Sequence, residues 1–548
     1  MITSILVSSL FLFYFSTTLA AQEYSIILGR PTDKSVTASI HSANDAEYFI
    51  SYGTGKEVLD HTIPIRILKA EQSEDIEISQ LQPNTRYYYT LSYKKTNSSS
   101  FTSSPLYTFI TQRSRGSSFR FVIEADEHLY DKKGVRSLYK ITLENQRKDS
   151  ADFMISLGDT FGDDHTPYET TTDDMKELHK DYLQYLGLVC HSMPFYFCLG
   201  NHEGENGFYM KEKPKENIAV YGTLWRKYYY PNPYPNDFYS GNIQKEEFGI
   251  EQPENYYAWT WGDALFIVLD VYRHCDINEK PKNWDWTLGE EQYTWFKKTL
   301  EQSSSKYKFV FAHHTRGQGR GGVLTAKGYE WGGYEINKNI WEFDKYRPNW
   351  ELPIHQLMVK HHVSVFFQGH DHLYAKEELD GIIYQEVPMA CDSTYEIGVL
   401  ANADAYTGIV LDGSGHLRVS VDSNDVTVDF VRAYLPADTL DSHHKNREIA
   451  YSYSLNKLTS TRNYSHNTSL VTTYWKHDNL VIECGEASPP LRSVEILSLQ
   501  GETIKKIHYE NSVYRYFLVT DMLPQGLYIV KTELENNYSK VQTIQILR

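Results

Sequence analysis

Five short apolar segments of this chain each end in residue types that commonly bind metal ions. They are FVIEADEH (residues 121–128), FMISLGDT (153–160), FYFCLGNHE (195–203), KFVFAHH (308–314) and VFFQGHDH (365–372). Each apolar run is rich in Val, Ile and Phe and too short for a helix, which predicts a buried β-strand. Because open α/β sheets place their sites at the carboxyl ends of strands, the sequence predicts a site at one edge of a sheet.

The residues at these strand ends indicate a pair of metal ions. Imidazole combined with carboxylate suits Fe, Zn or Mn better than Ca or Mg. Alternate residues leaving a strand point the same way, so Asp126 with His128, and His370 with His372, can each face one side of a metal cluster. The seven candidate ligands are Asp126, His128, Asp159, Asn201, His313, His370 and His372. Only the two aspartates are anionic, so two divalent or trivalent cations would retain a positive charge that attracts phosphate.

The net charge of the chain favours small phosphate esters over nucleic acids as substrates. The chain has 54 basic and 71 acidic residues, which gives a formal charge of −17. No run of Lys or Arg is long enough to form the basic stripe of a nucleic-acid-binding protein. Bulk repulsion disfavours polyanions, although a local positive field at the predicted metals still attracts a small anion.

The ordered blocks DEH, GD, GNHE, HH and GHDH resemble those of the calcineurin-like metallophosphoesterase family, over about residues 118–435. The resemblance implies an α/β fold in which two mixed β-sheets form a sandwich flanked by helices. It implies that one metal is held by Asp126, His128 and His372, the second by Asn201, His313 and His370, with Asp159 between them. His202 matches the family histidine that contacts the scissile phosphate and assists the leaving group. The implied reaction is in-line attack on phosphorus by a hydroxide that the metals activate.

Residues beside the predicted ligands are candidates for binding substrate. The segment TRGQGRGG (315–322) sets Arg316 and Arg320 among glycines, and arginine offers a planar bidentate partner for phosphate oxygens. A solvent-exposed loop without this role is the alternative. His314 either touches the substrate or supports the neighbouring ligand, and Glu203 is a candidate to orient a ligating imidazole.

Residues 23–112 predict a small domain upstream of the enzyme. Short runs such as EYFISYG and YYYTLSY alternate apolar and polar residues between turns, which is typical of a β-sandwich. LQPNTRYYYTL (81–91) resembles the tyrosine-corner region of a fibronectin type III domain, and this layout is similar to that of purple acid phosphatases. Those enzymes carry a Tyr three residues after the bridging Asp, where this chain has Gly162, so their colour-giving tyrosinate is expected to be absent.

The two ends of the chain predict export. Residues 1–21 have an apolar core that ends in small residues, which predicts a signal peptide, with an uncleaved anchor as the alternative. Residues 436–475 are rich in Ser, Thr, Asn, His and Tyr and predict a linker. Residues 476–548 return to alternating strands and resemble the C-terminal sorting domain of the type IX secretion system, with an ordinary β-sandwich as the alternative. The protein is therefore expected to be secreted or at the cell surface, without a membrane span after signal cleavage, and the secretion machinery is its expected partner.

Other patterns place helices, a hairpin and cysteines. Apolar residues at three and four spacing predict helices over 135–149, 173–188 and 288–302. Two strands are expected to turn at Gly262 and Asp263. The chain has five cysteines, and Cys190 and Cys198 are either bridged or free buried thiols.

Together these patterns predict a secreted, binuclear-metal phosphoric ester hydrolase. The phosphatase-like domain layout favours a phosphomonoesterase acting on small phosphate esters. A phosphodiesterase uses the same seven ligands and remains open. From a different class, a surface binding protein with a structural metal site is also open, although His202 beside a full ligand set argues against it.

Overall fold

The computed structural model describes most of the chain in two compact units, Met1–Lys457 and Leu458–Arg548. The described residues are 23–131, 133–162, 166–211, 216–276, 281–315, 320–403, 405–440, 444–455, 471–476, 479–484, 489–498, 503–513, 515–519, 526–535 and 539–546. The predicted signal peptide, Arg316 and a large part of the predicted linker lie outside these residues.

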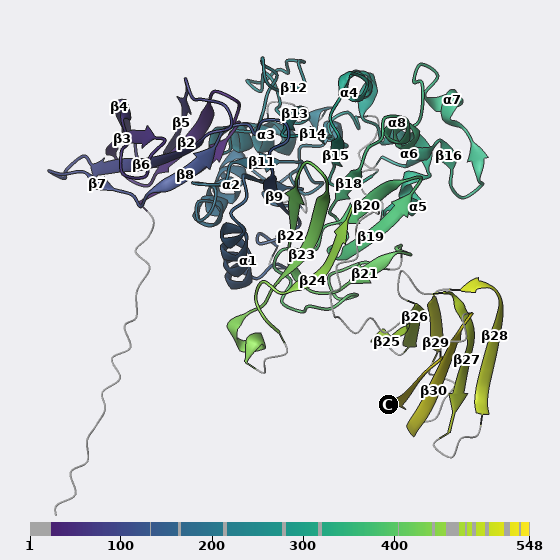
Figure 1. The fold of residues 1–548 in the computed structure, drawn as a ribbon. Helices are drawn as coiled ribbons and strands as arrows, with labels where there is room; N and C mark the ends of the chain where they lie inside the picture. Colours follow the sequence, from purple (N-terminus) through teal and green to yellow (C-terminus); the bar gives the residue numbers. More distant parts are fainter. Residues whose placement is uncertain are drawn as a thin grey trace, which may run out of the picture. The chain divides into compact units, whose positions relative to one another are not determined.

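Two mixed β-sheets form the centre of the first unit (Figure 1). One sheet has the order β11-β10-β9-β22-β23-β24 and the other the order β12-β13-β14-β15-β18-β20-β19-β21. Their strands are β9 (Phe119–Glu124), β10 (Phe153–Ser156), β11 (Phe195–Phe197), β12 (Ser240–Gly241), β13 (Tyr257–Trp261), β14 (Ala264–Val268), β15 (Tyr307–Phe311), β18 (Val365–Gln368), β19 (Tyr374–Leu379), β20 (Ile382–Glu386), β21 (Ile409–Leu411), β22 (Ser414–Val421), β23 (Val426–Ala433) and β24 (Ile449–Ser454). Parallel pairing joins β9, β10 and β11 in one sheet and β14, β15, β18 and β20 in the other. The predicted sandwich of two mixed sheets is confirmed.

Alternation along the strands builds two apolar layers. Phe121 and Ile123 of β9 point into the layer between the sheets, where Phe266 and Phe309 of the second sheet also lie. Val122 points to the other side and joins the layer beneath the helices. Each fully buried side chain of this size contributes roughly 1.5–3 kcal/mol relative to exposure. The strand ends are thus fixed on both faces by packing.

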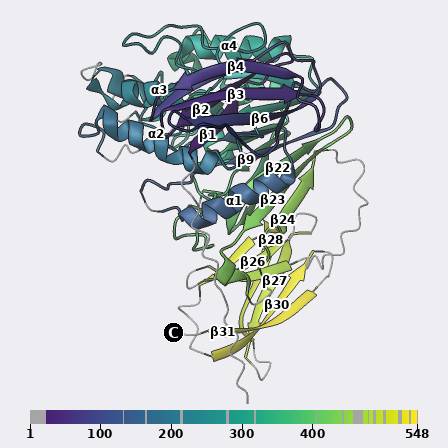
Figure 2. The same cartoon turned by 90° about the vertical axis from the view of Figure 1, so that its left-hand side faces the viewer.

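Helices pack against the sheets through the apolar layer on their outer sides, and α1 lies across β22 and β23 (Figure 2). The described helices are α1 (Arg136–Asp149), α2 (Thr172–Leu186), α3 (Ile218–Tyr229), α4 (Gly289–Gln302), α5 (Val323–Ala326), α6 (Tyr329–Gly332), α7 (Phe343–Tyr346) and α8 (Ile354–Lys360). Short 3-10 turns occur at η1 (Gly207–Lys211), η3 (Asn283–Asp285) and η4 (Pro436–Thr439), and a small hairpin at β16 (Tyr334–Glu335) and β17 (Ile340–Trp341). The three predicted helices and the hairpin at Gly262 are confirmed, with helix bounds that differ by at most two residues.

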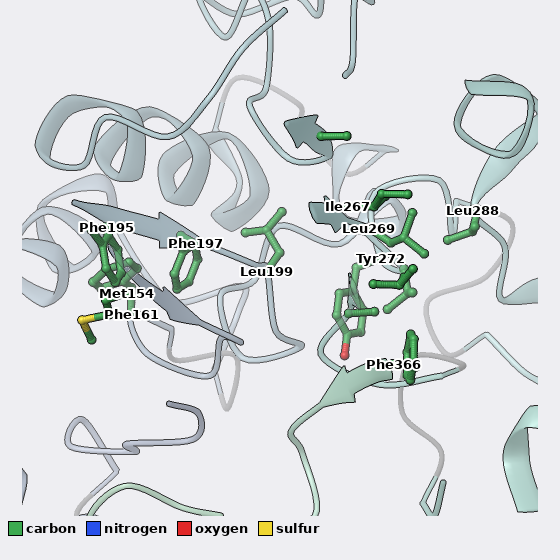
Figure 3. Packing of buried hydrophobic residues seen from close by; sticks show 14 of the residues in the cluster. Met154, Phe161, Phe195, Phe197, Leu199, Ile267, Leu269, Tyr272, Leu288 and Phe366 are labelled. Carbon is green, nitrogen blue, oxygen red and sulfur yellow. The ribbon is translucent and has the colours of Figure 1, made fainter. Parts of the chain in front are cut away.

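The apolar layer beneath the helices reaches up to the strand ends. Figure 3 shows part of it, with Phe195, Phe197 and Leu199 lying along β11 and its loop, and Ile267, Leu269 and Tyr272 along and after β14. This layer also receives Ile27 from the N-terminal domain. The loops that leave these strands therefore begin at residues that are held in place by core packing.

The N-terminal residues form two small sheets, which confirms the predicted β-structure. Their orders are β1-β2-β5 and β4-β3-β6-β7, with β8 paired to β6. The strands are β1 (Tyr24–Gly29), β2 (Val36–Ser42), β3 (Ala46–Gly53), β4 (His61–Leu68), β5 (Gln72–Ile78), β6 (Arg86–Lys95), β7 (Thr102–Ser103) and β8 (Tyr107–Ile110). Leu28 N–H donates to Cys190 O at 2.9 Å and Tyr89 OH donates to His191 O at 2.6 Å, so the domain is tied to the central sandwich. Its likeness to fibronectin type III stays a prediction.

The second unit is all β in its described residues. It has sheets of order β25-β26-β29 and β28-β27-β30-β31 around a small apolar core that includes Ile482, Val494 and Val530. Its strands are β25 (Val471–Lys476), β26 (Asn479–Cys484), β27 (Leu491–Leu497), β28 (Thr503–Val513), β29 (Arg515–Val519), β30 (Gly526–Leu534) and β31 (Ser539–Ile546). This agrees with the predicted C-terminal β-domain, while its role in sorting stays a prediction.

All five cysteines are buried free thiols, so Cys190 and Cys198 are not bridged.

Candidate metal centre

Loops from both sheets bring the candidate ligands together. Asp126 and His128 follow β9, Asp159 follows β10 and Asn201 follows β11, and these three strands are parallel neighbours in one sheet. His313 follows β15, and His370 and His372 follow β18, its parallel neighbour in the other sheet. Because the carboxyl ends of parallel strands lie at the same edge, the ligand-bearing loops meet there.

Asp126, His128 and His372 form one compact group. Asp126 Oδ1 lies 3.6 Å from His372 Nε2 and 3.9 Å from His128 Nε2. The two imidazole nitrogens are 3.0 Å apart. All the facing atoms of this group lie within 4.8 Å of one another, so a single cation can be shared by the three side chains.

Asp159, His313 and His370 form a second compact group. Asp159 Oδ2 lies 3.2 Å from His313 Nε2, which is 3.3 Å from His370 Nδ1. The same Asp159 oxygen lies 3.7 Å from His128 Nε2 and 3.9 Å from His202 Nε2. One carboxylate therefore lies between the two groups, and His202 stands beside it.

The donor set fits cations in one further respect. Asp126 Oδ1 and Asn201 Oδ1 are buried and accept no hydrogen bond within the described part of the chain. A buried polar atom without a partner costs about 1–3 kcal/mol. A cation in the first group would satisfy Asp126 Oδ1, and Asn201 Oδ1 is left open for the second cation. Two carboxylates, four imidazoles and an amide are suitable ligands for Fe, Zn or Mn.

The protonation states of three candidate histidines and of Asp159 suit metal binding, whereas His313 holds a proton. Burial lowers the pKa of His128, and it holds the pKa values of His370 and His372 well below the ordinary value, so these rings are neutral and offer a lone pair. Burial also raises the pKa of Asp159, but the neighbouring His313 and His202 outweigh it and hold that pKa well below the usual range. Although burial lowers it, Asp159 and Asp126 raise the pKa of His313 to about 10. A cation at this site must therefore displace a proton from His313.

Several candidate ligands have a strained backbone. The positive φ angles are 57° at Asp126, 46° at His128, 58° at Asp159, 81° at His370 and 61° at His372. Non-glycine residues seldom adopt the left-handed region, and residues held there cost of order 1–3 kcal/mol each. Such strain persists only where the surrounding structure maintains it, and it is common at functional sites.

Gly162 has no room for a side chain. A Cβ atom at this position would lie 1.3 Å from His202 O and 2.3 Å from Glu203 N. The backbone of the GNHE loop thus occupies the space in which a tyrosine would have to start. The absence of a tyrosine at Gly162 is therefore a steric requirement of this chain.

Replacing Gly162 with Ala should reduce turnover of p-nitrophenyl phosphate at least about tenfold, because the new methyl group must push the backbone of His202 away from Asp159. Steady-state kinetics and a thermal melt followed by circular dichroism would measure the effect. Gly55→Ala is the control, since its nearest atom would be 3.8 Å from the added methyl group, and it should behave like the wild type. Full activity in the Gly162 variant would contradict this account of the loop.

The predicted substrate contacts have different positions. His314 is fully buried, its Nε2 lies 3.1 Å from Gly321 O, and its ring centre is 5.0 Å from that of His370. This geometry favours support of His370. Arg320 donates from Nη1 to Asp371 Oδ1 at 2.7 Å, and its side chain is 48% exposed. Arg316 lies outside the described residues.

Two acidic residues have roles that the sequence did not indicate. Asp371, between His370 and His372, accepts hydrogen bonds from Gly321 N and Tyr406 OH, both at 2.8 Å, and so ties the Arg320 loop to the end of β18. Glu203 was a candidate to orient an imidazole, but its carboxylate accepts backbone N–H groups. The ring of His313 is instead oriented by Leu157 O, 2.8 Å from its Nδ1. Spacing in the sequence does not show which donors lie around a carboxylate.

Comparison with known proteins agrees with this geometry. The family described as Calcineurin-like phosphoesterase matches residues 119–374. The chain therefore contains a calcineurin-like phosphoesterase domain and is, by class, a metal-dependent phosphoesterase, a hydrolase. A search of curated proteins finds no match.

Among solved structures, PhoD is similar to this chain, with 14% identity and a TM-score of 0.52, over 89% of this chain and 93% of PhoD. GAP50, described as the anchor in the inner membrane complex of Plasmodium, matches with 13% identity and a TM-score of 0.34, over 61% of this chain and 88% of GAP50. At such identities a likeness shows the fold alone, and the PhoD match, with its TM-score above 0.5, shows that the two chains share a fold. No described helix has the length and apolar character needed to cross a membrane.

Proposed function

We propose that this chain is an exported phosphomonoesterase with a binuclear metal site. Asp126, His128 and His372 would hold one cation, and Asn201, His313 and His370 the second. The observation that carries the proposal is the position of Asp159, whose Oδ2 lies 3.7 Å from His128 Nε2 and 3.2 Å from His313 Nε2. A single carboxylate between two ligand groups is suited to bridge two ions of Fe, Zn or Mn.

When bound, the two cations supply Lewis acidity to the phosphoryl oxygens and lower the pKa of water toward neutrality. The protein side chains fix the geometry of the reaction. The N–H of His202 donates to Asp159 Oδ1 at 2.9 Å, which holds the GNHE loop against the carboxylate. The His202 side chain is 18% exposed, and its ring centre lies 5.1 Å from that of His128. From this partly open position, His202 would contact the phosphate and donate a proton to the leaving oxygen.

The experiment that tests the proposal combines elemental analysis with two assays. Purified full-length protein should contain about two transition-metal ions per chain. It should hydrolyse p-nitrophenyl phosphate faster than bis(p-nitrophenyl) phosphate, measured side by side. The opposite preference would make the chain a phosphodiesterase, and protein without metal or activity would contradict the proposal.

The Arg316 and Arg320 loop would bind the phosphate oxygens of the substrate. Replacing Arg320 with Ala should raise KM for p-nitrophenyl phosphate about tenfold or more, since a charge-assisted hydrogen bond contributes about 1.5–3 kcal/mol. Arg136→Ala is the control, because Arg136 on α1 pairs with Asp181 at the surface. An unchanged KM in the Arg316→Ala and Arg320→Ala double variant would remove the phosphate-binding role of this loop.

Export would follow from both ends of the chain. The apolar segment 1–21 would act as a signal peptide, and the C-terminal β-domain would be recognised by a type IX secretion machinery. Fractionation of the producing cells, with and without residues 476–548, would test this. Retention of the full-length protein in the cytoplasm would contradict it.

A further inference from the structure

We propose that Glu203 is a positioning residue that locks two ligand loops together and thereby sets the affinity of the chain for metal. The inference rests on the proposed metal site and extends it to a residue that touches neither a proposed cation nor the substrate. Glu203 follows His202 and is 1% exposed. The groups that surround its carboxylate define this role.

The Glu203 carboxylate accepts hydrogen bonds from four backbone N–H groups. Oε2 accepts from Gly200 N at 2.6 Å and from Asp159 N at 3.0 Å. Oε1 accepts from Thr160 N at 2.6 Å and from Phe161 N at 3.1 Å. A carboxylate has about four acceptor sites, so both oxygens are fully used. Three of the donors belong to the loop after β10 and one to the loop after β11.

The two loops could not approach this closely without glycine. A Cβ atom on Gly200 would lie 2.3 Å from Asp159 Oδ1, and one on Gly158 would lie 2.3 Å from Gly200 N. Asp159 itself has a φ of 58° and would relax from this conformation if its N–H lost its acceptor. Glu203 thus holds a strained residue whose side chain must reach both proposed cations.

The connection continues to the first ligand loop through Thr160. While its N–H donates to Glu203, its hydroxyl donates to Glu127 Oε2 at 2.6 Å. Glu127 stands between Asp126 and His128 in the sequence and is fully buried. One glutamate therefore fixes the relative position of loops that carry ligands for both proposed cations.

Glutamine is the most informative replacement. It has the shape of glutamate, but one of its two acceptor oxygens becomes an NH₂ donor. Whichever way the amide turns, that NH₂ group faces two backbone N–H groups. Among the described residues, these N–H groups donate to no acceptor other than Glu203. Outer partners of metal ligands typically change metal affinity by 10–100-fold when replaced. We expect Glu203→Gln to weaken binding of Mn²⁺ by about 10–100-fold.

The matched control is Glu205→Gln, two residues further on. Glu205 is 2% exposed and accepts hydrogen bonds from Arg226 at 2.6 Å and 2.9 Å and from Thr223 at 2.7 Å, so it holds helix α3. Its replacement leaves a buried arginine without its carboxylate and should lower the melting temperature. Binding of Mn²⁺ by the folded control should nevertheless match the wild type.

The experiment removes metal from full-length wild type and both variants, then titrates Mn²⁺ and follows the free ion by electron paramagnetic resonance. Circular dichroism melts report folding separately. Wild-type Mn²⁺ affinity in Glu203→Gln, or equal weakening in both variants, would overturn the positioning role. If Glu203→Gln does not fold, Glu203→Asp is measured, since its shorter side chain cannot reach all four donors, and wild-type affinity there would likewise overturn it. A wild type that binds no Mn²⁺ would instead contradict the proposed metal site.

Discussion

Replacing Asp159 with Asn should abolish turnover of p-nitrophenyl phosphate while the protein stays folded. The substitution removes the anionic charge between His313 and His128, at 3.2 Å and 3.7 Å from their Nε2 atoms. The loss of activity should exceed the roughly 100-fold upper range for outer partners of metal ligands, because this carboxylate is the proposed bridge itself. Asparagine tolerates the left-handed region, so the φ of 58° gives no reason for unfolding.

A matched substitution distinguishes the site from general stability. Asp152, on the same segment of chain, is 4% exposed and accepts hydrogen bonds from Arg113 at 2.7 Å and 3.0 Å. Asp152→Asn should lower the melting temperature and keep its activity. Steady-state kinetics and melts of both variants provide the comparison. Normal turnover in Asp159→Asn would remove the bridging assignment.

Removing the metals with a chelator should abolish activity and lower the melting temperature, and Mn²⁺ or Zn²⁺ should restore both. A ligand at about 1,000 times its Kd stabilises the folded state by about 4 kcal/mol.

The stability that the metals add should be larger at pH 8 than at pH 6. The charged His313, whose pKa rises from 6.5 to about 10 in the fold, stabilises the metal-free protein fully below pH 6.5, and this contribution is lost as pH rises toward 10. Cations bind neutral imidazole, so their effect grows over the same interval.

Thermal melts with and without metal at the two pH values would measure this effect. A melting temperature that does not respond to metal would contradict the site as a cation-binding centre. If the metal raises the melting temperature more at pH 6 than at pH 8, this would contradict the coupling between His313 and Asp159 but not the metal site.

The sequence was sufficient to predict the strands and the meeting of their ends. Apolar runs of four to seven residues have few alternatives in a buried core, and both Asp126 and His313 follow such runs directly. The hairpin at Gly262 was predictable because tight hairpin turns need a positive φ, which glycine adopts readily. The φ of Gly262 is 57°. Local chemistry at the strand ends thus indicated the candidate ligands, while the resemblance of the ordered blocks to a known family indicated the sandwich of two mixed sheets.

Long-range contacts were not predictable in the same way. Nothing in the sequence around Ile27 indicates that it packs into the core of the central sandwich. The hydrogen bonds of Glu203 and Asp371 depend on backbone groups that come close only after folding. Patterns along a chain report on periodicity and on neighbours, whereas these partners lie far apart in the sequence.

The left-handed backbone at five candidate ligands has a consequence for engineering. Transplanting Asp126, His128, Asp159, His370 and His372 onto another scaffold by matching side-chain positions alone would fail, because ordinary strand and helix geometry cannot present them from φ angles of 46° to 81°. The graft would have to include the turns and the interlocking glycines as well. A design based on this centre must therefore reproduce its backbone conformation before it places the side chains.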